Sequence, residues 1–281
     1  MPFADETYIA QPENYRTIGR HVRKHGILVT MPDETVYTVR NLFTVESDNT
    51  KLAKNADDTE ASRYLTVGLS LAPFTLAGMG NVCASASPHC AAGCLNTAGK
   101  GLVKDALGRE TVQRARIAKT RALLSRDTRA WFVAALYEQI ENHRRRASRK
   151  GLRLAVRLNV LSDLPFENML PGLFSAFPDV QFYDYTKIVS RLGRTPSNYD
   201  LTFSLSETNE RDALGALARG FRIAAVFSHR QAFPTFWRGF RVVNADAHDA
   251  RFLDGPAVVC ALKAKGLMRA QVGKSGTMVQ A

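Results

Sequence analysis

The chain has 281 residues, of which 45% are hydrophobic, enough to build a folded core and to exclude intrinsic disorder as the first interpretation. No apolar run approaches the roughly 20 residues that a membrane-spanning helix needs, and the N-terminal segment lacks the pattern of a signal peptide. Four cysteines, three of them within twelve positions, do not suit a secreted disulfide framework. We therefore expect a cytoplasmic protein without a membrane partner.

The net charge of +12, with a pI near 9.8, favours polyanionic partners such as nucleic acid. The basic residues concentrate between residues 109 and 150, and the end of this segment is the candidate nucleic-acid contact. A solvated helical face has the same composition, and both interpretations stay open. The candidate contact residues are Arg144, Arg145, Arg146, Arg149 and Lys150.

Residues 1–62 are polar and predict a β-rich N-terminal extension. Within them, residues 26–31 and 35–45 are rich in β-branched and aromatic side chains and flank the turn residues Pro32 and Asp33, as in a β-hairpin. Residues 47–62 have the composition of a loop.

The segment from about Leu102 to Arg149 predicts helix, because apolar residues recur there at steps of three and four. Asp127 and Thr128 are suited to cap a second helix, so a break is expected near Ser125.

About seven short apolar runs, separated by helical or loop segments, predict parallel strands with right-handed crossovers. This pattern indicates an α/β fold, a partial or complete (β/α) barrel over residues 63–266, followed by a flexible tail over residues 267–281. A doubly wound open sheet is the alternative. The expected strands are 64–73, 152–160, 180–185, 199–205, 221–228, 240–246 and 257–264.

The sharpest chemical feature is a loop with the pattern Cys83-x6-Cys90-x3-Cys94, which follows the first expected strand. Three thiolates in a flexible Gly/Ala/Ser-rich loop can converge on one centre, and soft sulfur ligands select zinc or an iron–sulfur cluster. Zinc requires a fourth ligand, for which His89, His248 and Cys260 are candidates. The alternative is that the cysteines are small packing residues.

Polar side chains gather where the expected strands end, which is where α/β proteins place their sites. Asp163 and Glu207 would equally serve as caps of the helices that follow them. The sequence 246–249 combines carboxylates with a histidine, as in metal binding or proton transfer. The candidate catalytic residues are Asp163, Asp184, Lys187, Glu207, Asp246 and His248, and the candidate cofactor-binding residues are Asn159, Ser204 and Ser206.

The segment from about Asn49 to Gly266 resembles a family of bacteriophage proteins, which would place the chain in the host cytoplasm. The residues that carry this resemblance are LSLAP, NVCASASPHCAAGCLNTAGKG, ARIAKTR, VRLNVLSDLPFE, FPDVQFYDYTK, YDLTFSLSE and NADAHDARFLD.

A cysteine triplet after the first strand of a β/α series is also similar to the architecture of radical S-adenosylmethionine enzymes. That resemblance implies a [4Fe–4S] cluster on Cys83, Cys90 and Cys94, with S-adenosylmethionine near Ser204, Ser206 and Glu207. The spacing differs from the C-x3-C-x2-C usual in that superfamily, and NVLSD (159–163) stands in place of the usual Gly-Gly-Glu.

These features give a first hypothesis of an iron–sulfur enzyme acting on a nucleotide or nucleic-acid substrate. The second hypothesis is a basic nucleic-acid-binding protein without catalysis, in which the cysteine loop is a structural zinc clip. A third interpretation is an inactive enzyme barrel that serves as a host-interaction protein.

Overall fold

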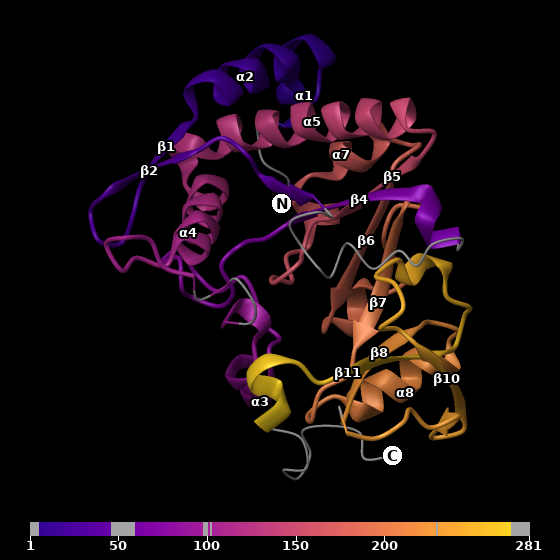
Figure 1. The fold of residues 1–281 in the computed structure, drawn as a ribbon. Helices are drawn as coiled ribbons and strands as arrows, with labels where there is room; N and C mark the ends of the chain where they lie inside the picture. Colours follow the sequence, from indigo (N-terminus) through magenta and orange to yellow (C-terminus); the bar gives the residue numbers. More distant parts are fainter. Residues whose placement is uncertain (1–5, 46–59, 98–100, 102, 229, 271–281) are drawn as a thin grey trace.

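The computed structural model describes residues 6–45, 60–97, 101, 103–228 and 230–270 (Figure 1). Two strands form a separate hairpin, and nine form one large sheet in the order β3-β4-β5-β6-β7-β8-β11-β10-β9. The strands are β1 (Ile27–Thr30), β2 (Val36–Val39), β3 (Phe43–Val45), β4 (Tyr64–Leu69), β5 (Arg153–Arg157), β6 (Gln181–Thr186), β7 (Tyr199–Ser204), β8 (Ile223–Phe227), β9 (Phe236–Trp237), β10 (Phe240–Asn244) and β11 (Val259–Lys263).

All neighbouring strands from β4 to β10 in the large sheet pair in parallel, and only the edge strands β3 and β9 are antiparallel. The seven parallel strands coincide with the seven apolar runs of the sequence, so the prediction of a parallel α/β fold is confirmed. Parallel pairing places the carboxyl ends of these strands at one edge of the sheet.

The sheet remains open across the described residues, because β3 and β9 are its two edges. The complete-barrel alternative is therefore not confirmed: closure would require these two edges to pair with each other. What is shown is the coarser fold, a nine-stranded, mostly parallel sheet with helices.

The helices connect the strands and cover one face of the sheet. Helix α4, of 14 residues, and helix α5, of 24 residues, lie between β4 and β5 in the chain. The break between them is at Ser125, as expected. The helices are α1 (Glu6–Ile9), α2 (Pro12–His25), α3 (Pro88–Ala92), α4 (Thr111–Leu124), α5 (Arg126–Arg149), α6 (Phe166–Met169), α7 (Pro171–Ala176) and α8 (Glu210–Ala218), with short 3-10 turns at η2 (Glu60–Arg63), η3 (Leu95–Thr97), η5 (Val189–Arg191), η6 (Arg251–Leu253) and η7 (Gly266–Ala270).

Side chains alternate along the strands, and the alternation separates a helix-covered face from a second face. Val156 and Phe182 are fully buried in the main core, with Phe132 of α5 and Phe174 of α7. Arg157 and Tyr185, one and three residues further along their strands, line a cavity on the opposite side. The second face therefore holds the cavity at the carboxyl ends of the strands, and η6 packs on the rest of it through Phe252, which contacts Tyr64 and Tyr183.

The N-terminal segment contains the expected hairpin, β1–β2, but also a helix that the polar composition concealed. Figure 1 shows α2 lying along the outer side of α5. Tyr15 and Val22 of α2 are buried there, and Arg23 pairs with the nearly buried Glu138 of α5 at 2.9 Å. The helix is amphipathic, with a narrow apolar stripe between many charged residues, so the polar composition of residues 1–62 did not predict a helix.

None of the described helices is long and apolar enough to cross a membrane. Most of the expected loop 47–62 lies outside the described residues, as do residues 271–281 of the expected tail. The described part of that loop is the 3-10 turn η2.

The close approach of α2 to α5 depends on Gly19. A Cβ atom at this position would lie 2.4 Å from Cβ of Glu138, which is too close for any side chain. We expect Gly19→Ala to lower the free energy of unfolding by about 1–3 kcal/mol, because the two helices must separate. Gly215 of α8 is the matched control, since a Cβ there meets nothing within 4 Å.

Gly215→Ala should instead stabilise the protein by about 0.5–1 kcal/mol through helix propensity. Urea unfolding curves of both variants provide the measurement. Equal stability of wild type and Gly19→Ala would show that α2 does not pack as described.

Candidate functional site

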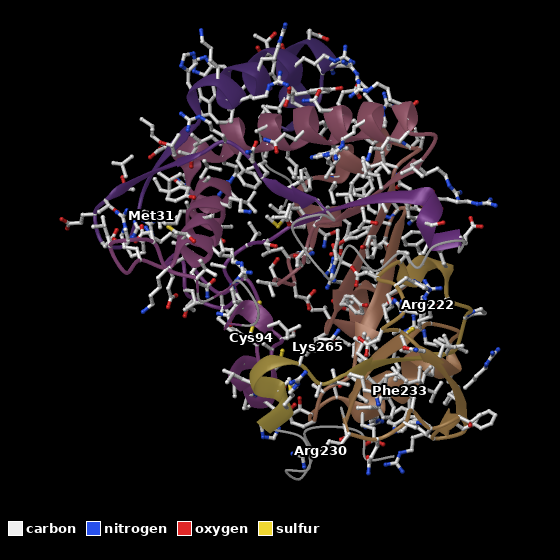
Figure 2. All side chains as sticks on the ribbon, viewed as in Figure 1. Met31, Cys94, Arg222, Arg230, Phe233 and Lys265 are labelled. Carbon is white, nitrogen blue, oxygen red and sulfur yellow. The ribbon has the colours of Figure 1, made fainter. Side chains whose placement is uncertain are left out.

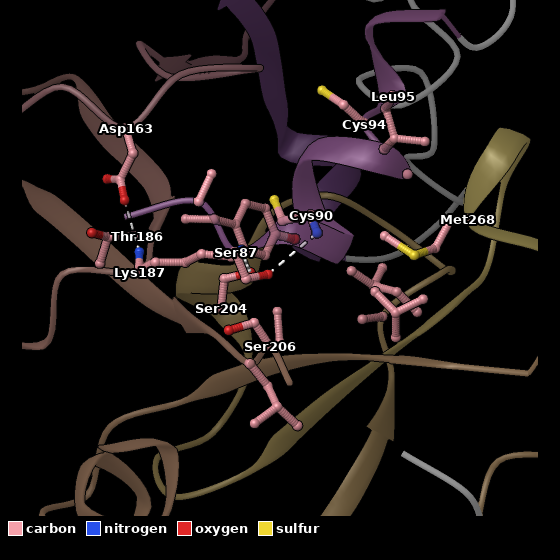
Figure 3. A pocket seen from close by; sticks show the side chains of 18 of the residues that line it. Ser87, Cys90, Cys94, Leu95, Asp163, Thr186, Lys187, Ser204, Ser206 and Met268 are labelled. Carbon is pink, nitrogen blue, oxygen red and sulfur yellow. Dashed lines mark hydrogen bonds between the residues drawn. The ribbon is translucent and has the colours of Figure 1, made fainter. Parts of the chain in front are cut away.

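A cavity of about 920 Å³ lies over the carboxyl ends of the parallel strands. It brings together the three cysteines of the loop and nearly all of the polar strand-end residues expected from the sequence. Figure 3 shows Cys90 and Cys94 on one side and Lys187, Ser204 and Ser206 on the strand ends across from them. The expected residues that line it are Cys83, Cys90, Cys94, Asn159, Asp163, Lys187, Ser204, Ser206, Glu207, Asp246 and His248.

The cysteine loop folds back over this cavity as a short turn and a short helix. Ser87 begins α3 by accepting a hydrogen bond from the backbone N–H of Cys90 at 3.2 Å, and Pro88 occupies the first helical position. Gly93 ends the helix against Met268, whose Cε would be 2.6 Å from a Cβ at this position. The loop is therefore enclosed from the side by the turn η7.

Glu207, which follows β7, holds the cysteine loop to the sheet. Its carboxylate accepts a hydrogen bond from Oγ of Ser87 at 2.7 Å and another from the backbone N–H of His89 at 3.0 Å. Burial acts to raise the pKa of Glu207, but these two hydrogen bonds outweigh it and lower the pKa. The interpretation of Glu207 as a cap of the following helix is wrong, because Asn209 occupies the N-cap of α8.

The three thiols are close enough to influence one another electrostatically. The pKa of Cys83 is raised to about 11, first by burial and then by the charges of Cys94 and Cys90. The sulfur of Cys83 also donates to the carbonyl oxygen of Leu161 at 3.3 Å. Deprotonating Cys83 at neutral pH therefore requires a positive centre beside it, as metal binding supplies.

Among the described residues, no three cysteine, histidine or carboxylate side chains stand close enough to share a single metal ion. The chemistry of the donor set nevertheless fits a soft metal centre, because three thiols face one cavity. A cluster of several irons with bridging sulfides spans more space than one ion, so its cysteines stand further apart than the ligands of one zinc.

Asp163 takes part in a buried network. It lies 2.7 Å from Arg191 and accepts a hydrogen bond from the backbone N–H of Lys187 at 2.8 Å. Arg191, in turn, forms a two-pronged ion pair with Glu167, at 2.7 and 2.8 Å. Asp163 is not a helix cap either, since Pro165 occupies the N-cap of α6. These contacts fix the loop after β5 against the end of β6.

Asp184 is the one candidate catalytic residue that does not line the cavity. It is fully buried behind Asn159 and accepts hydrogen bonds from the backbone N–H of Asn159 at 2.7 Å and from the hydroxyl of Tyr199 at 2.8 Å. Burial raises the pKa of Asp184 to about 7, although Arg157 and these donors favour the charged form. Asp184 thus orients Asn159, which lines the cavity.

Three charged groups of the cavity differ in how they are paired. Lys187 donates to Oγ of Ser204 at 2.8 Å and pairs with no carboxylate in the described part of the chain. Asp246 is held by Lys265 at 2.8 Å. His248 lies 3.0 Å from Arg251, and burial and this arginine lower its pKa. Lys187 is therefore the cation best placed to receive an anionic group of a ligand.

The basic cluster at the end of α5 is remote from this cavity. The helix ends at Arg149 and the chain then enters β5 at its amino end, whereas the cavity lies at the carboxyl ends. Arg144 and Arg145 are engaged with Glu141, at 3.0 and 2.8 Å. The candidate contact Arg144, Arg145, Arg146, Arg149 and Lys150 and the cysteine loop are thus two separate features.

Sequence reasoning missed two groups of cavity residues. Arg157 lines the cavity and lies 3.1 Å from Asp249. Its position, a charged residue inside the apolar run of β5, was the sequence signal that could have identified it. Phe236 and Trp237 also line the cavity, from a two-residue strand too short to give a sequence pattern. Cys260, one of the proposed fourth ligands, is buried in β11 and does not line the cavity, whereas His89 and His248 do.

The fold and the cavity define a class of protein: an open, mostly parallel α/β sheet with a three-cysteine loop facing its strand ends. The chain matches the family model described as Gene product 88 over residues 42–281, and it belongs to this family. The matched region contains the whole large sheet and the cysteine loop. This match supports the resemblance to a bacteriophage protein family. No curated protein and no solved structure matches the chain.

Glu207→Gln should loosen the cysteine loop. The amide offers one acceptor atom in place of two, so either Ser87 or His89 loses its partner, at a cost of about 1–3 kcal/mol in the free energy of unfolding. We expect iodoacetamide to alkylate Cys90 faster in Glu207→Gln than in wild type, with the rate measured by mass spectrometry. Asp212→Asn, an exposed change on α8, is the control, and identical alkylation rates in all three proteins would contradict the role of Glu207.

Asp184 should make stability depend on pH around neutrality. Because burial raises its folded pKa from 3.8 to about 7, its contribution to stability is fully present below about pH 4 and is lost as the pH rises to 7. Up to about 4 kcal/mol is at stake. Urea unfolding at pH 5 and at pH 8 gives the measurement. The free energy of unfolding should fall more between pH 5 and pH 8 in wild type than in Asp184→Asn, and the exposed control Asp179→Asn should behave as wild type does.

Proposed function

We propose that this protein is an iron–sulfur enzyme of the radical S-adenosylmethionine type, with a nucleotide or nucleic-acid substrate. The observation that carries the proposal is that Cys83, Cys90 and Cys94 line the same cavity as the polar ends of four parallel strands. Ligand sites of parallel α/β sheets lie at these ends. A cluster held by three cysteines leaves one iron open to a ligand in the cavity.

In this proposal the three cysteines would hold a [4Fe–4S] cluster, which, once reduced by an external one-electron donor, would supply the electron for cleavage of S-adenosylmethionine. The chain's own residues bind and orient the ligand. Lys187, with no carboxylate partner among the described residues, is placed to receive a carboxylate or phosphate group. Ser206, which follows β7, offers a hydroxyl group to the cavity.

Other residues would act by positioning. Glu207 keeps α3, and with it Cys90, at the end of β7. Asp184 keeps Asn159 in one orientation through hydrogen bonds to its backbone and side-chain nitrogens, at 2.7 and 3.2 Å. Asp246 is kept near the cavity by Lys265, and His248 by Arg251. Preorganised polar groups of this kind lose little energy to rearrangement when a ligand binds.

A zinc clip in a nucleic-acid-binding protein is the second candidate, and one observation favours it. Nδ1 of His89 is buried, makes no hydrogen bond and lies 3.5 Å from a carboxylate oxygen of Glu207. His89 precedes Cys90 in the sequence and lines the same cavity. A neutral imidazole with three thiolates is a donor set typical of structural zinc. In this candidate the protein binds nucleic acid without catalysis.

The metal content of protein purified without oxygen distinguishes the two. The first proposal predicts about four irons and four sulfides per chain, with visible absorbance, and loss of most of both in Cys90→Ser. Cys260→Ala is the matched control, because this cysteine is buried in β11 away from the cavity, and it should keep the cluster. One zinc without sulfide would favour the clip, and protein with neither metal would contradict both candidates.

A further inference from the structure

We propose that the hairpin at the rim of the cavity, together with Arg230, binds single-stranded nucleic acid and presents one nucleotide to the cavity. The proposal rests on the proposed function, because it names the substrate class of the same cavity. The four residues concerned, called the rim surface below, are Arg230, Phe236, Arg238 and Arg241.

The rim surface belongs to a basic stretch of the chain. Residues 213–245 contain five arginines and no aspartate or glutamate. Two of the arginines lie outside the rim surface: Arg222 pairs with Asp200, and Arg219 lies over the ring of Phe221. The remaining three are exposed members of the rim surface. Figure 2 shows Arg230 in the half of the molecule that also holds Cys94, opposite α2 and α5.

The geometry of the hairpin places an aromatic ring beside a cation. Arg238 and Gly239 both have positive φ, 51° and 84°, as in the two-residue turns that close tight hairpins. The register then pairs Arg241 directly with Phe236, so the two side chains project from the same side. Phe236 is 62% exposed even though it lines the cavity, whereas the adjacent Trp237 is buried.

An exposed phenylalanine at the mouth of a large cavity has no partner within the described fold that explains its position. Stacking on a nucleobase would cover it, and the arginines would meet the flanking phosphates. Arg230 and Arg241 have no acidic partner among the described residues. Arg238 pairs with Glu210 at 2.9 Å, which ties the hairpin to the start of α8.

A single strand suits this surface better than a duplex. In a duplex the faces of the bases are stacked on one another and are inaccessible to a phenylalanine ring. A single strand exposes each base, and the cavity of about 920 Å³ behind Phe236 is large enough for a nucleotide next to a cofactor. Trp237 and Lys263 line the wall beyond the rim, where an inserted nucleotide would lie.

The test is binding of a fluorescently labelled single-stranded DNA oligonucleotide to the full chain, followed by anisotropy at several salt concentrations. Phe236→Ala should weaken binding about 5- to 100-fold, and Phe236→Trp should restore it, because stacking needs only an aromatic face. Arg241→Gln and Arg230→Gln should each weaken binding and lower the slope of log K against log salt by about one.

The matched control is Arg20→Gln, an exposed arginine of α2, which packs on the outer side of α5. It should change neither affinity nor slope. Far-UV circular dichroism and thermal unfolding of each variant show whether the fold is intact. Loss of binding in Arg20→Gln with unchanged binding in the rim variants would overturn the proposal, as would tighter binding of duplex than of single-stranded DNA, or no binding by wild type.

The Cys90→Ser variant separates this proposal from the function proposed above. Its cluster content is read from iron and sulfide, and its oligonucleotide binding from anisotropy in the same preparation. Binding within about twofold of wild type, with the dependence on Phe236 retained, supports the rim surface whatever metal is found. Binding that requires Cys90 but not Phe236 would assign the contact to the cysteine loop and overturn the proposal.

Discussion

Parallel pairing of seven strands is the constraint on which the rest of the molecule depends. Each strand from β4 to β8 pairs with the next in the sequence, and β11 and β10 extend the same sheet. Every loop that follows one of these parallel strands therefore leaves from the edge formed by their carboxyl ends. The cysteine loop after β4 and Glu207 after β7 are 113 residues or more apart in the sequence, yet they meet at this edge. A shift in the register of the strands would separate Glu207 from the cysteine loop.

Buried charge beneath the cavity reinforces this arrangement. Arg191, in the connection after β6, joins Asp163 and Glu167 of the connection after β5 to Tyr199 at the start of β7. Arg157 pairs with Asp249 on the other face of the sheet. Such groups are costly to bury unless each finds its partners, so they favour one arrangement of the loops over its alternatives. The polar residues of the cavity are therefore held by a second layer of interactions rather than by the loops alone.

Much of this fold can be predicted from the sequence, since strongly apolar runs such as those of β8 and β11 leave few alternatives to buried strands. The Cys triplet and the strand-end polar residues were likewise visible in advance. The order β8-β11-β10 could not be predicted, because β8 pairs with β11 rather than with β9 or β10, which follow it in the sequence. The role of Glu207 was misjudged because its partners, Ser87 and His89, are almost 120 residues away.

The packing of Met268 against Gly93 has a practical consequence for handling this protein. The last described turn, η7, ends at Ala270 beside α3. A purification tag or fluorescent protein joined directly after this turn would therefore be tethered close to the cysteines and the cavity. The other end of the chain enters the fold through α1 and α2, on the outer side of α5, so a fusion placed there begins well away from the thiols (Figure 1).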